Sequence, residues 1–178
     1  MKSAIRSCTP EDVSVLAETI RTSFKDVAER FGLTQENASR HPSNCREDWI
    51  QKDTERGVTY FILEKEDSVA GCVALEVSNP EVCYLERLAV LPDQRCQGFG
   101  KALVDYALSQ ARLLGSHRVS IGIIAEHAEL KNWYQHLGFL EEETKEFSHL
   151  PFRVTFMSYK LDRDCQQSDA GFQGRRNR

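Results

Sequence analysis

The sequence lacks any apolar run long enough to span a bilayer, and its first residues do not form a signal peptide. It also lacks an excess of positive charge, because 23 lysines and arginines stand against 27 acidic residues, for a net charge of -4. Nucleic-acid binders usually carry a basic stripe, so this balance argues against that class. We therefore expect a cytoplasmic protein that binds neither membranes nor nucleic acid, with a charge balance suited to an amine ligand.

Paired cysteines are also missing. None of the cysteines forms a Cys-x-x-Cys pair or has a histidine at metal-ligand spacing, although the chain contains six: Cys8, Cys45, Cys72, Cys83, Cys96 and Cys165. This pattern indicates neither a disulfide framework nor a metal site. We expect free thiols and no bound metal.

The length of 178 residues and an ordinary globular composition predict one domain, residues 1–162, followed by a polar tail, 163–178, that is typical of disorder. Apolar periodicity and turn residues predict the elements in order. These are a strand at 4–6, helices at 9–31 and 45–55, a hairpin of strands 58–64 and 69–77, a strand at 82–91, a helix at 98–114, a strand at 119–123, a helix at 127–136 and strands at 140–143 and 153–161.

The segment from Arg95 to Gly100 lies between a predicted strand and a predicted helix. The first turn of a helix leaves backbone N–H groups free, so a glycine turn there favours binding of a phosphate. A nucleotide-triphosphatase loop would need glycine in place of Arg95 and a hydroxyl in place of Ala102. A dinucleotide fingerprint would need glycine in place of Leu103. The sequence therefore matches neither of these two motifs. The order strand, turn, helix, strand predicts that strands 82–91 and 119–123 run parallel.

The sequence Arg95-Cys-Gln-Gly-Phe-Gly100 resembles the Gln/Arg-x-x-Gly-x-Gly/Ala signature of the GNAT superfamily of acyl-CoA-dependent N-acetyltransferases. Leu85-Glu-Arg-Leu-Ala-Val90 before it and Trp133-Tyr-Gln-His-Leu-Gly-Phe139 after it are similar to the family core, and the resemblance covers residues 5–161. It implies the α/β (α+β) GNAT fold. That fold has a mixed, mostly antiparallel, strongly twisted sheet of six to seven strands and about four helices, splayed between strands 4 and 5.

The resemblance also implies acetyl-CoA as cosubstrate and assigns residues to it. Backbone amides of the turn would bind the pyrophosphate, the preceding strand would bind the pantetheine arm, and Tyr134 would protonate the departing thiolate. His127 replaces the usual asparagine and can still donate a hydrogen bond to the coenzyme. The implied cofactor-binding residues are Leu88, Ala89, Val90, Arg95, Cys96, Gln97, Gly98, Phe99, Gly100, Lys101, His127 and Tyr134.

Acetyl transfer to an alkyl amine needs a base, because an amine with a pKa of about 10 is mostly protonated at neutral pH. Glu86 is the candidate base, and the alternative is that it pairs with an arginine or lysine across the sheet. For Tyr134 the alternative to an acid is a core aromatic residue beside Trp133. For Cys96 in the turn, we expect that only its backbone matters.

The acceptor would enter between the first two helices and the last hairpin of the implied fold. Residues that could line its pocket are Phe24, Phe31, Trp49, Tyr84 and His149. We expect a primary amine, as a small amine, a polyamine or a lysine-type peptide acceptor, that attacks acetyl-CoA directly in a ternary complex. The alternative is a catalytically silent GNAT-fold module that binds acyl-CoA or a metabolite. Exposed strand edges in the last hairpin could support a homodimer.

Overall fold

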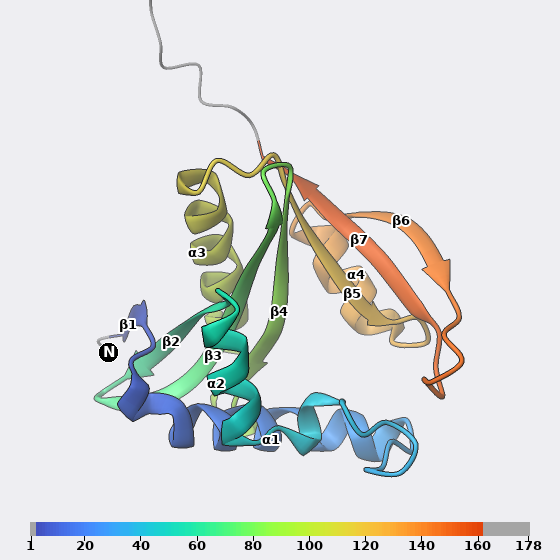
Figure 1. Cartoon of the computed structure of the whole chain (residues 1–178), viewed down its shortest axis with the longest axis horizontal. Helices are drawn as coiled ribbons and strands as arrows, with labels where there is room; N and C mark the ends of the chain where they lie inside the picture. Colours follow the sequence, from blue (N-terminus) through green and yellow to red (C-terminus); the bar gives the residue numbers. More distant parts are fainter. Residues whose placement is uncertain (1–2, 162–178) are drawn as a thin grey trace, which may run out of the picture.

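The computed structural model describes residues 3–161, and the tail predicted at 163–178 lies outside them (Figure 1). In this part of the chain seven strands form one sheet in the order β1-β2-β3-β4-β5-β7-β6. The strands are β1 (Ser3–Ser7), β2 (Thr59–Lys65), β3 (Ser68–Asn79), β4 (Val82–Val90), β5 (Arg118–Ile124), β6 (Leu140–Lys145) and β7 (Val154–Lys160). The helices are α1 (Val13–Arg30), α2 (Glu47–Glu55), α3 (Phe99–Leu113) and α4 (Ala128–His136), so the predicted elements are confirmed with small shifts at their ends.

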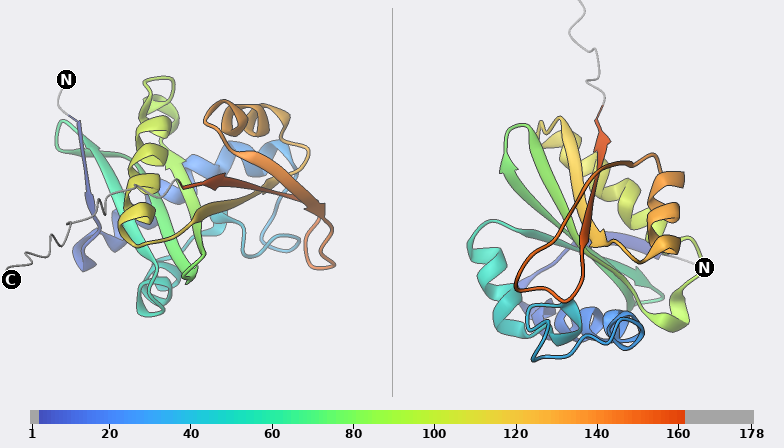
Figure 2. Two further views of the ribbon diagram at one scale, coloured as in Figure 1. Left: turned by 90° about the horizontal axis from the view of Figure 1, so that it is seen from above. Right: turned by 90° about the vertical axis from the view of Figure 1, so that its right-hand side faces the viewer.

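The helices cover the sheet on both faces, α1 and α2 on one and α3 and α4 on the other (Figures 1 and 2). Each side has its own core. Leu16 and Ile20 of α1 pack with Trp49 and Ile50 of α2 on the first face, whereas α3 packs on the second face with Phe139 and Tyr134. None of the helices described is long and apolar enough to cross a membrane.

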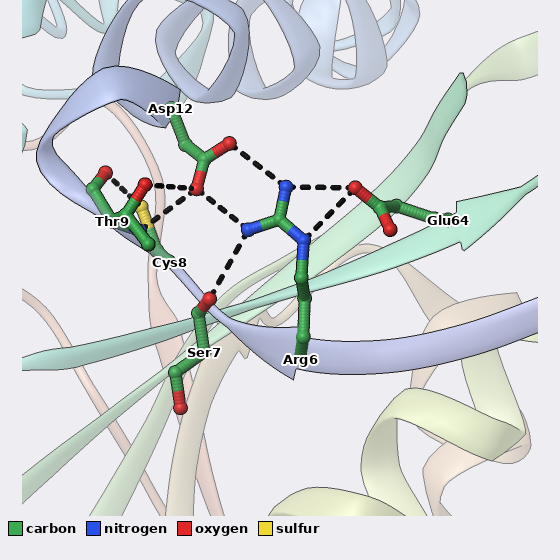
Figure 3. A network of polar contacts seen from close by, with 6 residues as sticks. All are labelled: Arg6, Ser7, Cys8, Thr9, Asp12 and Glu64. Atoms are coloured by element: carbon green, nitrogen blue, oxygen red, sulfur yellow. Dashed lines mark hydrogen bonds and ion pairs between the residues drawn. The ribbon is translucent and has the colours of Figure 1, made fainter. Parts of the chain in front are cut away.

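The start of α1 differs from the prediction of one continuous helix from residue 9. Pro10–Asp12 form a 3-10 turn, and the α-helix begins at Val13. Figure 3 shows the reason, since Arg6 of β1 binds Asp12 at 2.7 Å and Glu64 of β2 at 2.7 Å. Asp12 also accepts the Thr9 backbone N–H at 2.8 Å. These bonds fix the turn beside the sheet edge before the helix starts.

β4 and β5 pair in parallel over three residues, Val82–Tyr84 with Arg118–Ser120, and then separate. β5 nevertheless stays paired with β7 along its whole length, to Ile124. Figure 1 shows the two strands diverging toward the end of the sheet where α1 and the loop after it lie. The other strand pairs are antiparallel, so the predicted mixed, mostly antiparallel sheet with a splay between strands 4 and 5 is confirmed.

β6 is an edge strand, and all six of its residues are exposed. It pairs with β7 on one side only. An unpaired edge of this kind can accept another strand. A homodimer formed through this hairpin stays a prediction.

Candidate functional site

The connection between β4 and α3 forms a tight turn with two left-handed residues. Pro92–Gln94 make a 3-10 turn, after which Cys96 has φ +59° and Gly98 has φ +82°. Gly98 is the residue before the first turn of α3, and no side chain caps the helix there. A side chain at Gly98 would meet open space, so glycine is favoured by the backbone conformation and not by crowding. At Gly100 the reason is crowding, because an added Cβ would lie 3.3 Å from the ring of Trp133.

The turn leaves a run of backbone donors unused. Within residues 3–161, the N–H groups of residues 96–101 have no hydrogen-bond acceptor. Six consecutive donors at the positive end of a 15-residue helix create a strong preference for an anion. The geometry therefore suits a pyrophosphate, as the sequence predicts.

A cavity of about 530 Å³ lies in front of this turn. Its walls come from the C-terminal half of α1, the end of β4, the turn itself and the start of α4. Ten of the predicted cofactor-binding residues line it, namely Leu88, Ala89, Val90, Arg95, Cys96, Gly98, Phe99, Gly100, Lys101 and His127. Gln97 does not, because its side chain accepts a hydrogen bond from Lys65 Nζ at 2.9 Å on the β2 side.

The Arg95 side chain ties the turn to its neighbours. Its guanidinium donates to the Val90 carbonyl at 3.2 Å and to the Ser23 carbonyl of α1 at 2.7 Å, and it pairs with Asp26. The charge of Arg95 is thus used within the protein, and it holds α1 against the turn.

The edge of β4 that faces the splay is unpaired beyond Tyr84. A bulge opposite Val73 interrupts its pairing with β3, and Arg87 there has φ +50°. Glu86 and Arg87 consequently lie on the same face of the sheet, and the next residue, Leu88, packs on the opposite side. Leu88 has no pairing partner in either neighbouring strand, so its backbone can bind an extended arm as a further strand would.

His127 precedes α4 and lines the cavity. Its Nδ1 lies 3.3 Å from the Leu130 backbone nitrogen and 3.4 Å from Glu129 Oε2. A backbone N–H can only donate, so when Nδ1 accepts it, Nε2 carries the proton of the neutral ring. Burial, and then the nearby Arg30, lower the pKa of His127, which favours that neutral form. A neutral ring with a protonated Nε2 can donate one hydrogen bond to a ligand.

Glu86 is half-buried on β4, on the α2 side of the sheet. Burial, followed by the nearby Glu76, raises the pKa of its carboxyl group above the usual range. Among the described residues Glu86 makes no hydrogen bond or ion pair, so the alternative of a cross-strand pair finds no partner there. Arg87, the next residue, is instead paired with Asp53, at 2.8 Å. A partly buried, unpaired carboxylate with a raised pKa has the character of a general base.

Tyr134 is 5% exposed in α4 and packs edge-on against Trp133 and Phe139. It is not among the residues that line the 530 Å³ cavity. Its burial raises the pKa of the phenol. Within residues 3–161 the hydroxyl has no hydrogen-bond partner, so it remains available to a ligand, although the surroundings are those of a core aromatic residue.

The residues predicted for the acceptor pocket do not gather at one place. Phe24 lines the large cavity, and its ring lies 5.8 Å from that of His41. Phe31 packs on His127, and His149 packs on Phe147 in the loop before β7. Trp49 lines a second cavity, and Tyr84 is 38% exposed on β4.

Several residues of the large cavity were not predicted. They come from the last turns of α1 and from α4, and they are Ser23, Asp26, Val27, Arg30, Leu130 and Trp133. The sequence holds a signal for the first group, since Val27 and Arg30 follow Leu16 and Ile20 at helical spacing. Leu16 and Ile20 lie in the core, and the last turns of the same helix face the cavity.

Comparison with known proteins agrees with this geometry. Residues 21–139 match the model of the acetyltransferase (GNAT) family. An uncharacterised N-acetyltransferase of Escherichia coli (strain K12), YjgM, is 29% identical over 138 residues, which cover 76% of this chain and 80% of YjgM.

Solved structures share the fold at lower identity. The protein yncA of Salmonella typhimurium, solved with its cofactor acetyl-CoA, has a TM-score of 0.68 at 19% identity, with 96% of this chain and 100% of that chain covered. The PaiA N-acetyltransferase of Thermoplasma acidophilum, in complex with coenzyme A, has a TM-score of 0.69 at 18% identity, with 90% and 99% covered. Since the family model matches well over half of the sequence, the chain belongs to the GNAT family of acyl-CoA-dependent acetyltransferases.

Proposed function

We propose that this protein transfers the acetyl group of acetyl-CoA to a primary amine by direct attack in a ternary complex. The observation that carries the proposal is the run of six free N–H groups at residues 96–101, which opens on a cavity of about 530 Å³ beside an unpaired strand edge. Such a site offers donors to a pyrophosphate and a backbone edge to a pantetheine arm. Two relatives of the same fold were solved with acetyl-CoA or coenzyme A, which supports this choice of cosubstrate.

In the proposed mechanism Glu86 takes a proton from the ammonium group of the acceptor, directly or through a water molecule. The neutral amine then attacks the thioester carbonyl, and the C–S bond breaks. The thiolate of coenzyme A receives a proton from Tyr134, and the nitrogen of the new amide, which still carries one extra proton after the attack, returns a proton through solvent to the tyrosinate. The raised pKa of Glu86 suits the first step, because a base with a pKa closer to neutrality accepts a proton more readily. The raised pKa of Tyr134 makes the last transfer less favourable, so this assignment rests on the free hydroxyl.

The experiment is release of free thiol from acetyl-CoA in the presence of a panel of primary amines. We expect thiol release that depends on the amine, with the acetylated amine identified by mass. Binding of acetyl-CoA without turnover of any amine would instead favour a silent acyl-CoA-binding module. A mass measurement of coenzyme A that copurifies with the protein tests the cofactor site separately.

Gly98→Val is the variant matched to the cofactor site. A β-branched residue at φ +82° disfavours the turn and redirects the N–H donors. We expect acetyl-CoA binding to weaken at least 10-fold. A matched control is Gly115→Val, which also replaces a glycine of positive φ, +79°, but at the far end of α3.

A further inference from the structure

A second cavity, of about 160 Å³, lies in the loop between α1 and α2. Its lining residues are Gln35, Ser39, Arg40, Asn44, Arg46 and Trp49. It shares no lining residue with the 530 Å³ cavity proposed to bind acetyl-CoA, so the phosphates of coenzyme A do not account for it. A pocket this small suits the end group of a ligand and not a whole nucleotide.

The loop that builds this cavity is held in place by internal bonds. Asn44 donates to the Ala38 carbonyl at 3.2 Å, and the Ala38 backbone N–H donates to the Thr34 carbonyl at 2.9 Å. Leu33 and Ala38 are buried against Ile124 of β5. The cavity is therefore formed by ordered backbone, and its lining side chains start from fixed positions.

Two guanidinium groups and one indole dominate the lining. The guanidinium carbon of Arg40 lies 4.7 Å from the Trp49 ring centroid, and that of Arg46 lies 5.9 Å from it. Arg46 pairs with Asp48 at 3.0 Å, but Arg40 has no carboxylate partner within residues 3–161. In a chain of net charge -4, two arginines on one indole with one free charge mark a site for an anion.

Trp49 supplies a further, independent observation. Its side chain is 6% exposed, and its Nε1–H is buried without a hydrogen-bond partner. An unsatisfied buried donor of this kind is uncommon in native proteins and indicates a missing acceptor. The start of α2 adds to this preference, because no side chain caps the helix at Arg46.

The same indole connects the cavity to the proposed base. The guanidinium of Arg87 lies 5.9 Å from the Trp49 ring centroid, and Arg87 directly follows Glu86 on the same face of the sheet. Trp49 and Arg87 therefore form one line of contacts from the cavity to the residue beside Glu86.

We propose that the acceptor is a small amino acid-like molecule, whose carboxylate binds Arg40, Arg46 and the Trp49 indole while its amine faces Glu86. This inference rests on the proposed function, and it narrows the acceptor from amines in general to amines that carry a carboxylate. A bidentate arginine–carboxylate pair gives both affinity and orientation, which a flexible amine otherwise lacks. Polyamines, which have no anionic group, would be poor acceptors.

The kinetic test compares acceptors that differ in the carboxylate alone. The panel contains α-amino acids and ω-amino acids from glycine to 6-aminohexanoate, each beside its primary amide. We expect kcat/KM to favour at least one carboxylate over its amide by 10-fold or more. In Arg40→Gln that preference should fall about 10- to 100-fold through KM, because a charged hydrogen bond contributes about 1.5–3 kcal/mol.

The control variant is Lys25→Gln, which removes an exposed cation of α1 that lines neither cavity. It should leave the preference for the carboxylate unchanged, and the KM for acetyl-CoA should stay the same in both variants. Equal turnover of acids and amides by the unmodified protein would overturn the inference. An equal loss for both kinds of acceptor in Arg40→Gln would do the same.

A binding test separates this inference from the proposed function. The chain has two tryptophans, so a nitrogen-15 NMR spectrum contains two indole N–H signals. The signal that disappears in Trp49→Phe belongs to Trp49. Titration with the same amino acids should shift the Trp49 signal, and titration with the amides should not. This readout needs no turnover and holds even if no amine is acetylated. If none of the amino acids shifts the Trp49 signal, the proposal is overturned.

Discussion

Asp53 is the centre of a buried polar network beneath β4, and its replacement by asparagine is a demanding test of the structure. The residue is 5% exposed. Its carboxylate accepts the Tyr60 hydroxyl at 2.7 Å and binds Arg87 at 2.8 Å and Arg56 at 2.9 Å. Asp53→Asn keeps the shape but removes the charge, and it turns an NH₂ group toward at least one of these donors.

The expected loss is large because Arg87, whose side chain is only 14% exposed, would lose its counter-charge. Breaking a buried ion pair from one side costs about 3–5 kcal/mol. In a protein of this length each kcal/mol lowers Tm by about 2–4 °C, so we expect a decrease of about 6–20 °C. The matched control is Glu18→Gln, which removes one partner of an exposed pair with Arg21 on α1. Exposed pairs contribute little, so its Tm should stay close to that of the unmodified protein.

The assay is thermal and urea unfolding followed by circular dichroism, for Asp53→Asn, Arg87→Gln and the double variant. Since the two residues act as a pair, the double variant should lose clearly less than the sum of the two single losses. If Asp53→Asn lowers Tm by less than about 3 °C, the assignment of a buried pair is refuted. Strict additivity in the cycle would show that the two side chains are not coupled.

The remaining predictions concern the reaction and its pH dependence. Glu86→Gln should lower kcat by about 10²- to 10⁴-fold if Glu86 is the base, while the KM for acetyl-CoA stays the same. The folded-state pKa of Glu86 is raised, so the folded protein is stabilised by the neutral carboxyl group and loses that stability as pH rises through this pKa. Glu86→Gln should therefore raise Tm at pH 7 and have less effect at pH 4. Glu76→Gln removes a nearby negative charge that raises this pKa, so the acidic limb of the kcat/KM profile should move to lower pH, and an unchanged limb would exclude Glu86 as its source. Tyr134→Phe should lower kcat with nearly unchanged acetyl-CoA binding, and an unchanged kcat would remove Tyr134 from the mechanism.

Local chemistry explains why much of the fold could be predicted. Thr9 and Pro10 indicate the start of the first helical segment, Gly115 has φ +79° just after α3, and the two apolar runs of β2 and β3, separated by turn residues, match their antiparallel pairing. The glycine turn can be predicted as an anion site because its donors are backbone groups, and Gly98 readily adopts the left-handed conformation that the turn requires.

Other features depend on residues that are distant in sequence. The bulge that sets Arg87 beside Glu86 arises from pairing with β3, and the counter-charge comes from Asp53 in α2. The carboxylate of Glu86 is unpaired because the adjacent cation, Arg87, binds Asp53 instead. Strand alternation alone could not indicate this. The surroundings of Trp49 also depend on distant residues, since Arg40 reaches its ring only because the loop after α1 packs against α2.

The sequence by itself determined the order of the elements, the position of the turn predicted to bind an anion and the family of the protein. Each of these depends on neighbouring residues, through hydrogen bonds and torsion angles that act over a few positions. The tertiary structure decided which charges are paired, which edge of β4 is free and where a second cavity forms. Those properties depend on contacts between segments far apart in the chain, and packing of the sheet against its helices fixes them.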